Sequence, residues 1–122
     1  GLEVDFLNGA PGVRSARYAG EPADTKKNIE LLLSSLANTD QRTAQFRTVI
    51  ALSLKDRIYT FEGICKGRII NEAKGDGGFG YDPVFIPEGA NVTFAEMSTT
   101  EKNIYSHRKK AFAKMISFLK NM

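Results

Sequence analysis

The sequence has little of what disulfide-bonded, zinc-binding and membrane-spanning proteins need. Its 122 residues hold one cysteine, Cys65, and one histidine, His107. A single cysteine excludes an internal disulfide framework and any cysteine-based zinc site, and it suits a reducing compartment. No apolar run approaches the roughly 20 residues that span a membrane, and no secretory hydrophobic segment is present. We therefore expect a cytoplasmic protein with no membrane partner.

The composition is typical of one folded unit. Hydrophobic residues make up 42% of the chain and charged residues 25%, which is enough for a single domain with one core over residues 1–122. Cys65 lies in a run of alternating apolar residues, so we interpret it as a packed core residue rather than a reactive thiol. The chain opens directly on a strand-like pattern at Gly1–Phe6 without an initiator methionine. This opening predicts that the sequence is the latter part of a longer protein.

The net charge is +3, and basic residues are concentrated toward the C-terminus. These residues are Lys102, Arg108, Lys109, Lys110, Lys114 and Lys120. They fit either the solvated face of a helix or a surface for a phosphate-rich ligand, and charge alone does not choose between the two. Aromatic residues do not interleave with the basic cluster, so a nucleic-acid partner is not expected.

Apolar residues with a period of two predict several strands. The first covers Leu2–Phe6 and is followed by a turn at residues 8–12. Residues 43–54 and 58–70 read as two long strands, and the short link between them predicts an antiparallel hairpin. A further short strand is expected within residues 83–86.

Helix signals occur at three places. Asp24 is a candidate N-cap for a helix that ends near Ala37, with apolar residues at helical spacing. Ser98 and Glu101 fit a capping box, and a last helix starts near Ser106. Its apolar face is predicted to hold Ala111, Met115, Phe118, Leu119 and Met122. The fold class is mixed α/β, with a largely antiparallel sheet of long hairpin strands flanked by helices.

The glycine-rich stretch from Gly75 to Gly80 is a candidate ligand-binding loop. Its backbone is free to approach a ligand closely, although a bulged hairpin corner would use glycine in the same way. The aromatic rings of Phe79 and Tyr81 offer faces for stacking on a base, and Asp82 can accept hydrogen bonds from ring N–H groups. The stretch is not a Walker loop, because no Lys-Ser/Thr pair follows the glycines.

His107 is a second candidate, because it adjoins Ser106 and Arg108 at the predicted start of a helix. Backbone N–H groups and the helix dipole favour an oxygen acceptor there. Lys102 is close enough in sequence to point to the same side. A surface histidine and an exposed lysine are the plain alternatives. Together the two candidate regions suit a planar, oxygen-rich base at one end and a polyanion at the other.

No metal centre or nucleophilic triad can be read from the chain. Nothing ties a serine to His107, and no cluster of histidine and cysteine exists. The acidic residues are scattered, and Glu3 and Asp5 are the only candidates for a magnesium site.

Taken together, several ordered strings resemble the inosine triphosphate pyrophosphatase family of nucleotide hydrolases, and the resemblance runs through nearly the whole chain. The strings are Gly1–Asp5, Asn8–Val13, Ser15–Gly20, Gly78–Phe85, Thr93–Met97, Glu101–Asn103 and Ser106–Arg108. The resemblance implies a site lined by residues of these strings. Phe79, Gly80, Tyr81 and Asp82 would line the base pocket, His107 and Arg108 would contact the purine, Lys102 would touch the substrate, and Arg17 would approach the phosphates.

The same resemblance implies hydrolysis of deaminated purine nucleoside triphosphates (ITP, dITP, XTP) to the monophosphate and pyrophosphate. It also implies Mg²⁺ as cofactor and a homodimer. The family's phosphate loop, its catalytic lysine, its general base and its main metal ligands would all lie before Gly1, so no catalytic or metal-binding residue is assigned within the chain. The alternative is a nucleotide-binding or assembly fragment without turnover.

Overall fold

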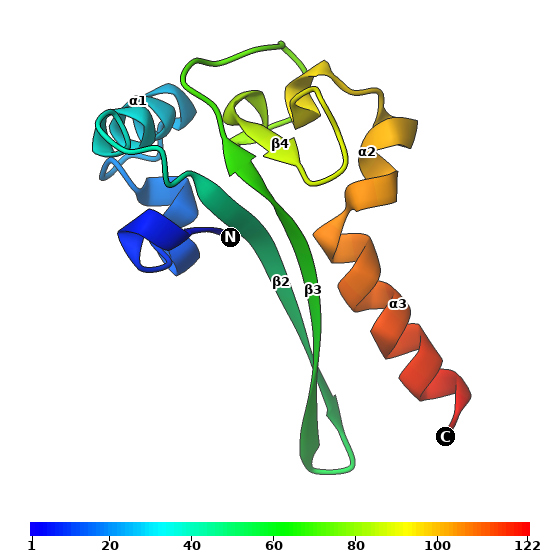
Figure 1. The fold of residues 1–122 in the computed structure, drawn as a ribbon. Helices are drawn as coiled ribbons and strands as arrows, with labels where there is room; N and C mark the ends of the chain where they lie inside the picture. The colour runs from blue at the N-terminus through cyan, green and yellow to red at the C-terminus, as the bar shows by residue number, and fades with distance from the viewer.

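The computed structural model describes residues 1–122 and contains one four-stranded antiparallel sheet. The strands are β1 (Leu2–Val4), β2 (Thr43–Leu54), β3 (Arg57–Ile69) and β4 (Phe85–Pro87), and they pair in that order across the sheet. Helices flank this sheet (Figure 1). The predicted mixed α/β class with a long antiparallel hairpin is therefore confirmed.

The β2–β3 hairpin is the longest feature of the molecule. Its register runs from Thr43 opposite Arg68 to Leu54 opposite Arg57. Lys55 and Asp56 form the turn with φ values of 51° and 64°, as expected for a tight turn that matches the strand twist. The distal part of the hairpin projects away from the other strands (Figure 1). We call this projecting part, residues 49–62, the arm.

The first strand is shorter than predicted. β1 ends at Val4, and Phe6 lies in a 3₁₀ turn, Asp5–Leu7, with 45% of its surface exposed. The backbone N–H of Val4 donates to Ala10, and its carbonyl accepts from Gly9, each at 3.0 Å. These two bonds fold the chain back before the alternation can continue as a strand. A second 3₁₀ segment, Gly12–Arg17, follows the turn.

Helix α1 (Thr25–Ser35) begins where the sequence predicts. The side chain of Asp24 accepts from the backbone N–H of Lys27 at 3.1 Å, so Asp24 is the N-cap. Leu32 and Leu36 are fully buried on the inner side of this helix.

Helices α2 (Thr99–Tyr105) and α3 (His107–Lys120) follow each other directly. Ser98 and Glu101 form the predicted capping box at the start of α2. Ser106 ends α2 and caps α3 by accepting from the backbone N–H of Lys109 at 3.1 Å. This direct junction places His107 at the first position of α3 and so determines the direction in which its side chain points.

Helix α3 packs on β2 and β3 along the arm. Ala111 is fully buried, and the ring of Phe118 lies 4.6 Å from Tyr59 and 5.4 Å from Phe61. The predicted apolar face is wrong at its end, because Leu119 and Met122 are 40% and 65% exposed. Leu119 and Met122 are exposed because the last turn of α3 packs against little of the sheet.

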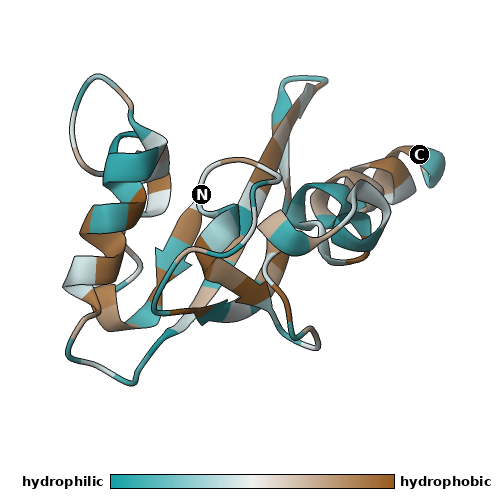
Figure 2. Ribbon diagram, turned by 90° about the horizontal axis from the view of Figure 1, so that it is seen from above, coloured by the Kyte–Doolittle hydropathy of each residue, from teal (hydrophilic) through white to brown (hydrophobic).

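The core lies at the opposite end from the hairpin turn, where all four strands meet. Its fully buried side chains include Leu2, Val4, Ile69, Val84 and Phe85. Figure 2 shows hydrophobic segments of the strands and of α1 turned toward this region. Cys65 belongs to the same cluster, and burial raises the pKa of its thiol to about 11. The prediction that Cys65 is a packed core residue is confirmed.

None of the three α-helices combines the length and the apolar character that crossing a bilayer requires.

Candidate functional site

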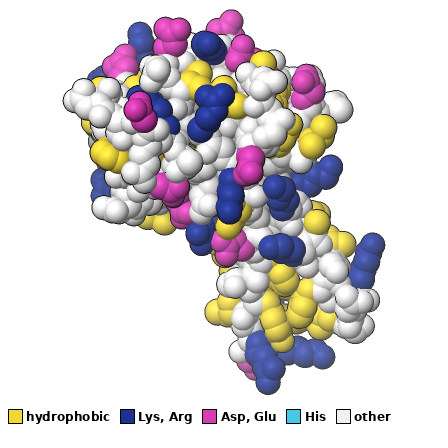
Figure 3. All heavy atoms as spheres, in the orientation of Figure 1, with side chains coloured by type: hydrophobic (Ala, Val, Ile, Leu, Met, Phe, Trp, Pro, Cys, Tyr) yellow, Lys and Arg dark blue, Asp and Glu magenta, His cyan; other side chains and the backbone are white.

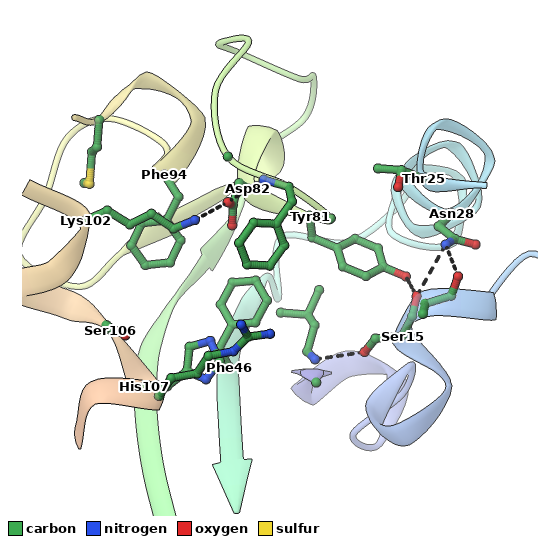
Figure 4. Close-up of a pocket in the computed structure, with 18 of the residues that line it drawn as sticks. Ser15, Thr25, Asn28, Phe46, Tyr81, Asp82, Phe94, Lys102, Ser106 and His107 are labelled. Carbon is green, nitrogen blue, oxygen red and sulfur yellow. Dashed lines mark hydrogen bonds and ion pairs between the residues drawn. The ribbon is translucent and has the colours of Figure 1, made fainter. Parts of the chain in front are cut away.

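A cleft of about 840 Å³ opens between the first residues of the chain, the glycine-rich loop and the α2–α3 junction. Its lining includes Ser15, Phe46, Asp82, Lys102 and His107. Figure 4 shows these residues reaching inward from segments that are far apart in sequence. The cleft therefore joins the two stretches that the sequence singled out.

The glycine loop turns sharply so that one carboxylate faces the cleft. Gly78 and Gly80 adopt φ values of 71° and 58°, which side chains other than glycine seldom tolerate. A Cβ atom at Gly78 would collide with the carboxylate of Asp82. The backbone N–H of Phe79 donates to Asp82 Oδ2 at 2.9 Å. Glycine is thus required here for the close approach of loop and carboxylate.

Asp82 forms an ion pair with Lys102. The Nζ atom lies 2.5 Å from Oδ2, and the two side chains are 25% (Lys102) and 6% (Asp82) exposed. The pair connects the glycine-rich stretch to helix α2 (Figure 4). Lys102 is therefore directed into the site instead of into solvent.

The ring of Phe79 lines the cleft and lies close to two cations. Lys102 Nζ is 4.4 Å from its centroid and Arg108 Cζ is 5.4 Å from it. With 63% of its surface exposed, Phe79 offers a ring face to a ligand. Phe94 forms a second apolar wall, 5.6 Å from Lys102 Nζ.

Tyr81 does not present its ring to the cleft in the same way, because only 5% of its surface is exposed. Its hydroxyl donates to the carbonyl oxygen of Ser15 at 2.7 Å, and burial raises the pKa of the phenol. The side chain of buried Asn28 donates to the carbonyl oxygen of Ala16 at 2.9 Å and accepts from the backbone N–H of Ala19 at 2.8 Å. Tyr81 and Asn28 together hold the Ser15–Ala19 segment as one wall of the cleft.

His107 lies on the floor of the cleft against strand β2. Its ring stacks on Phe46, with centroids 5.2 Å apart and planes 11° from parallel, and its Nδ1 shares a short hydrogen bond with Thr48 Oγ1. The pKa of His107 is lowered to about 4, chiefly by burial and also by the positive charges of Arg108 and Lys102, against the opposing effect of Asp82. The imidazole is therefore neutral near pH 7.

The comparisons with known proteins agree on one family. Residues 1–118 match the sequence profile described as the Ham1 family. The chain belongs to the Ham1 family. It is 54% identical over 119 residues to the dITP/XTP pyrophosphatase of Christiangramia forsetii, covering 98% of this chain and 63% of that protein. It is 52% identical over 120 residues to the dITP/XTP pyrophosphatase of Porphyromonas gingivalis, covering 98% of this chain and 62% of that protein.

Solved structures of this family have the same fold. The Staphylococcus aureus Ham1 protein superposes with a TM-score of 0.95 at 44% identity, covering 99% of this chain and 64% of that one. A nucleoside-triphosphatase, or dITP/XTP pyrophosphatase, from Mycobacterium abscessus gives a TM-score of 0.85 at 42% identity over 94% and 62% of the two chains. The Ham1 chain described here thus spans a little under two thirds of the length of the curated relatives it matches.

Not every predicted site residue of this Ham1 chain reaches the cleft. Phe79, Gly80, Tyr81, Asp82, Lys102, His107 and Arg108 all line it. Arg17 does not, since it lies in the 3₁₀ segment, forms an ion pair with Glu21 at 3.3 Å and keeps 58% of its side chain exposed. Its predicted approach to the phosphates stays a prediction.

The residues of this Ham1 chain do not fit a magnesium ion. No three histidine, cysteine, aspartate or glutamate side chains come together anywhere in residues 1–122. Asp82 supplies the only carboxylate of the cleft, and Lys102 already neutralises it. Glu3 bonds to Gln45 and Arg47, and Asp5 accepts from Thr43, all outside the cleft.

Several residues that build the cleft were not found from the sequence. Phe46 and Thr48 were interpreted only as part of a strand, and Asn28 only as part of a helix. Their role depends on which distant segment packs against them, and that is not encoded in local spacing. One usable signal existed: polar Asn28 lies among the apolar positions of α1, and a buried polar residue needs a partner.

Proposed function

We propose that this chain supplies the purine-binding part of an enzyme that hydrolyses deaminated purine nucleoside triphosphates (ITP, dITP and XTP) to the monophosphate and pyrophosphate. The observation that carries the proposal is the convergence of an exposed aromatic ring, a carboxylate and three nitrogen donors on one cleft. Relatives with the printed name dITP/XTP pyrophosphatase support it.

The cleft suits a base with a carbonyl at position six. Phe79 provides a face for stacking, and neutral His107 and cationic Arg108 provide donors for an oxygen acceptor. Hypoxanthine and xanthine carry that oxygen, whereas adenine presents an amino donor. An adenine base would leave the donors that it covers without a partner, at a cost of about 1–3 kcal/mol for each group. The expected preference is therefore for six-oxo purines.

The reaction as a whole implies a divalent metal and a base that activates water. Because the residues of this chain do not fit Mg²⁺, no metal-dependent step is assigned to them. What these residues do is bind and orient the nucleotide. Positioning of this kind contributes a large share of the rate in phosphoryl chemistry.

Nucleotide binding tests the proposal directly. Isothermal titration of the purified protein with ITP, XTP and ATP should give tighter binding of the two six-oxo nucleotides. Arg108→Ala should lower the ratio of ITP to ATP affinity by about tenfold, the value of one lost hydrogen bond to a charged donor. Lys109→Ala is the matched control, because this neighbouring cation is exposed and does not line the cleft. An unchanged ratio in Arg108→Ala would remove Arg108 from base selection.

Pyrophosphate release from ITP separates turnover from binding alone. Release of pyrophosphate and inosine monophosphate would support the enzymatic function. Selective binding of six-oxo nucleotides without any release would instead support the second function, a nucleotide-binding or assembly fragment. The relatives with the printed name dITP/XTP pyrophosphatase do not favour this second function.

Four further expectations stay predictions. A homodimer is tested by light scattering at several protein concentrations. The absence of a nucleic-acid partner is tested by duplex binding at low and high salt. The cytoplasmic location is tested by cell fractionation, and the single domain by whether limited proteolysis yields one resistant core.

A further inference from the structure

The orientation of the His107 ring is fixed by strand β2 rather than by the cleft. Phe46 and Thr48 alternate along β2 with one residue between them, so their side chains share one face of the sheet. Phe46 stacks flat against the imidazole, and Thr48 Oγ1 bonds to its Nδ1. The first contact sets the plane of the ring, and the second sets its rotation within that plane.

The backbone of His107 is fixed by the opposite strand. Gly63 is the cross-strand partner of Thr48. A Cβ atom at Gly63 would collide with the carbonyl oxygen of His107 and lie 2.7 Å from the backbone nitrogen of Ala111. The first turn of α3 therefore rests directly on the backbone of β3. Thr48 and Gly63, one residue from each hairpin strand, therefore support His107 at its ring and at its backbone. We call these two residues the seat.

The seat also determines which ring nitrogen faces a ligand. A neutral imidazole has one N–H donor and one acceptor, and the bond made by one nitrogen decides the character of the other. Thr48 occupies Nδ1, so Nε2 is the nitrogen left for a molecule in the cleft.

The hydroxyl of Thr48 makes no other hydrogen bond. If Nδ1 carried the proton, the hydroxyl hydrogen of this partly buried side chain would lack a partner, which costs free energy. The favourable arrangement has the hydroxyl donating to Nδ1 and the proton on Nε2.

We propose that Thr48 is a positioning residue for base selection: its hydroxyl holds His107 in the tautomer that directs an N–H donor from Nε2 into the cleft. This inference rests on the proposed function and deepens it. A donor at Nε2 pairs with the carbonyl oxygen of a six-oxo purine, whereas adenine presents an amino donor at that position. With the other tautomer the histidine would accept a hydrogen bond and the preference would weaken.

Two variants of Thr48 separate the hydroxyl from the shape of the side chain. Thr48→Val keeps the branched shape and loses the hydroxyl, and Thr48→Ser keeps the hydroxyl. We expect Thr48→Val to lower the ratio of ITP to ATP affinity by about tenfold, while Thr48→Ser retains the ratio of the unmodified protein. A residue with a merely structural role would weaken the binding of both nucleotides alike and leave the ratio unchanged.

Nitrogen-15 NMR of the imidazole reads the tautomer without any nucleotide, because His107 is the only histidine in the 122 residues. At pH 7 the unmodified protein and Thr48→Ser should show a protonated Nε2 and an unprotonated Nδ1, and Thr48→Val should show a mixture. A proton on Nδ1 in the unmodified protein overturns the proposal, as does an unchanged ratio in Thr48→Val. If no six-oxo preference exists at all, the proposed function fails, while the NMR result still decides the role of Thr48 in fixing the tautomer.

Discussion

The cleft end of the molecule and the arm are held together by different interactions. At the cleft end, buried polar groups such as Asp82, Tyr81 and Asn28 all have partners, and no buried side-chain nitrogen or oxygen lacks one. In the arm, Glu62 is the only residue whose side chain forms an ion pair or hydrogen bond. Ile58 and Val49 are 74% and 54% exposed there. Figure 3 shows hydrophobic side chains gathered between the hairpin and α3.

This difference shows where geometry is specified closely. Hydrogen bonds and ion pairs hold atoms at definite distances and angles, whereas apolar contacts tolerate small shifts of one surface on another. A ligand that is recognised through its polar groups needs the first kind of support. Substitutions at the cleft end should therefore change binding and stability together, and equivalent substitutions on the arm should change little.

The largest effect is expected from breaking the Asp82–Lys102 pair. Asp82→Ala leaves the partly buried ammonium of Lys102 without its counter-ion, and this should lower the free energy of unfolding by about 3–5 kcal/mol. Glu62→Ala removes one of the two carboxylate partners of Arg47, in a pair at 2.8 Å with side chains 41% (Glu62) and 39% (Arg47) exposed, so it should cost under about 1 kcal/mol. Urea unfolding measures both. Equal losses would contradict the contrast between the two regions.

Gly63→Ala should have the next largest effect, because Gly63 lies where the arm meets the start of α3. The added methyl group would push the helix away from β3, at a cost of about 1–3 kcal/mol. It should also displace His107 and weaken the preference for ITP over ATP. Thr60→Ala, on the same strand and exposed, is the matched control and should leave both quantities nearly unchanged. Intact nucleotide preference in Gly63→Ala would show that His107 does not depend on this seat.

The titration of His107 sharpens the comparison in a different way. Its pKa is about 4 in the folded protein, below the ordinary value of 6.5, because burial disfavours the charged ring. Arg108 and Lys102 act in the same direction, and Asp82 opposes them. The unfolded chain therefore takes up a proton at a higher pH than the folded protein does. Stability from the neutral ring is complete above about pH 6.5 and is lost as the pH falls toward 4.

Proton NMR of the ring follows this titration in water and in concentrated urea. The folded protein should show no midpoint between pH 6 and 8, and the unfolded chain should titrate near its ordinary value. A midpoint close to 6.5 in the folded protein would mean that the imidazole is open to solvent.

Elements with local signals were predicted well from the sequence. The hairpin follows from alternation on both sides of Lys55–Arg57, and the starts of α1 and α3 follow from Asp24 and Ser106. Caps and tight turns depend on residues that are neighbours in the chain, so their physics is visible in the sequence. The strand predicted through Phe6 was wrong because hydrogen bonds of Val4 to Gly9 and Ala10 compete with the alternation.

The candidate site was predictable in its members more than in its arrangement. The sequence indicated Phe79, Asp82 and Lys102 through the residue pattern and through the family resemblance, but it gave no sign that the last two are paired. It also suggested a stacking role for Tyr81, whose ring is buried while its hydroxyl supports the wall at Ser15. Such roles arise from contacts between segments far apart in the chain, and no local pattern records them.

The smallest effect is expected from removing a single hydroxyl group, which should matter at the cleft end but not on the arm. Tyr81→Phe removes the hydrogen bond to the carbonyl oxygen of Ser15 and should cost about 1 kcal/mol. The wall formed by Ser15–Ala19 should loosen, and the affinity for ITP should fall with it. Tyr59→Phe is the matched control on the arm, because the Tyr59 hydroxyl makes no hydrogen bond and its ring only packs on Phe118.

Both phenylalanine variants keep the ring, so urea unfolding and ITP titration compare the two hydroxyls directly. Tyr59→Phe should change neither stability nor affinity. A loss in Tyr59→Phe as large as that in Tyr81→Phe would mean that the arm depends on polar contacts as much as the cleft end does. A change in stability alone in Tyr81→Phe would mean that the Ser15 wall supports the fold without shaping the site, because the ligand would then be insensitive to where that wall lies.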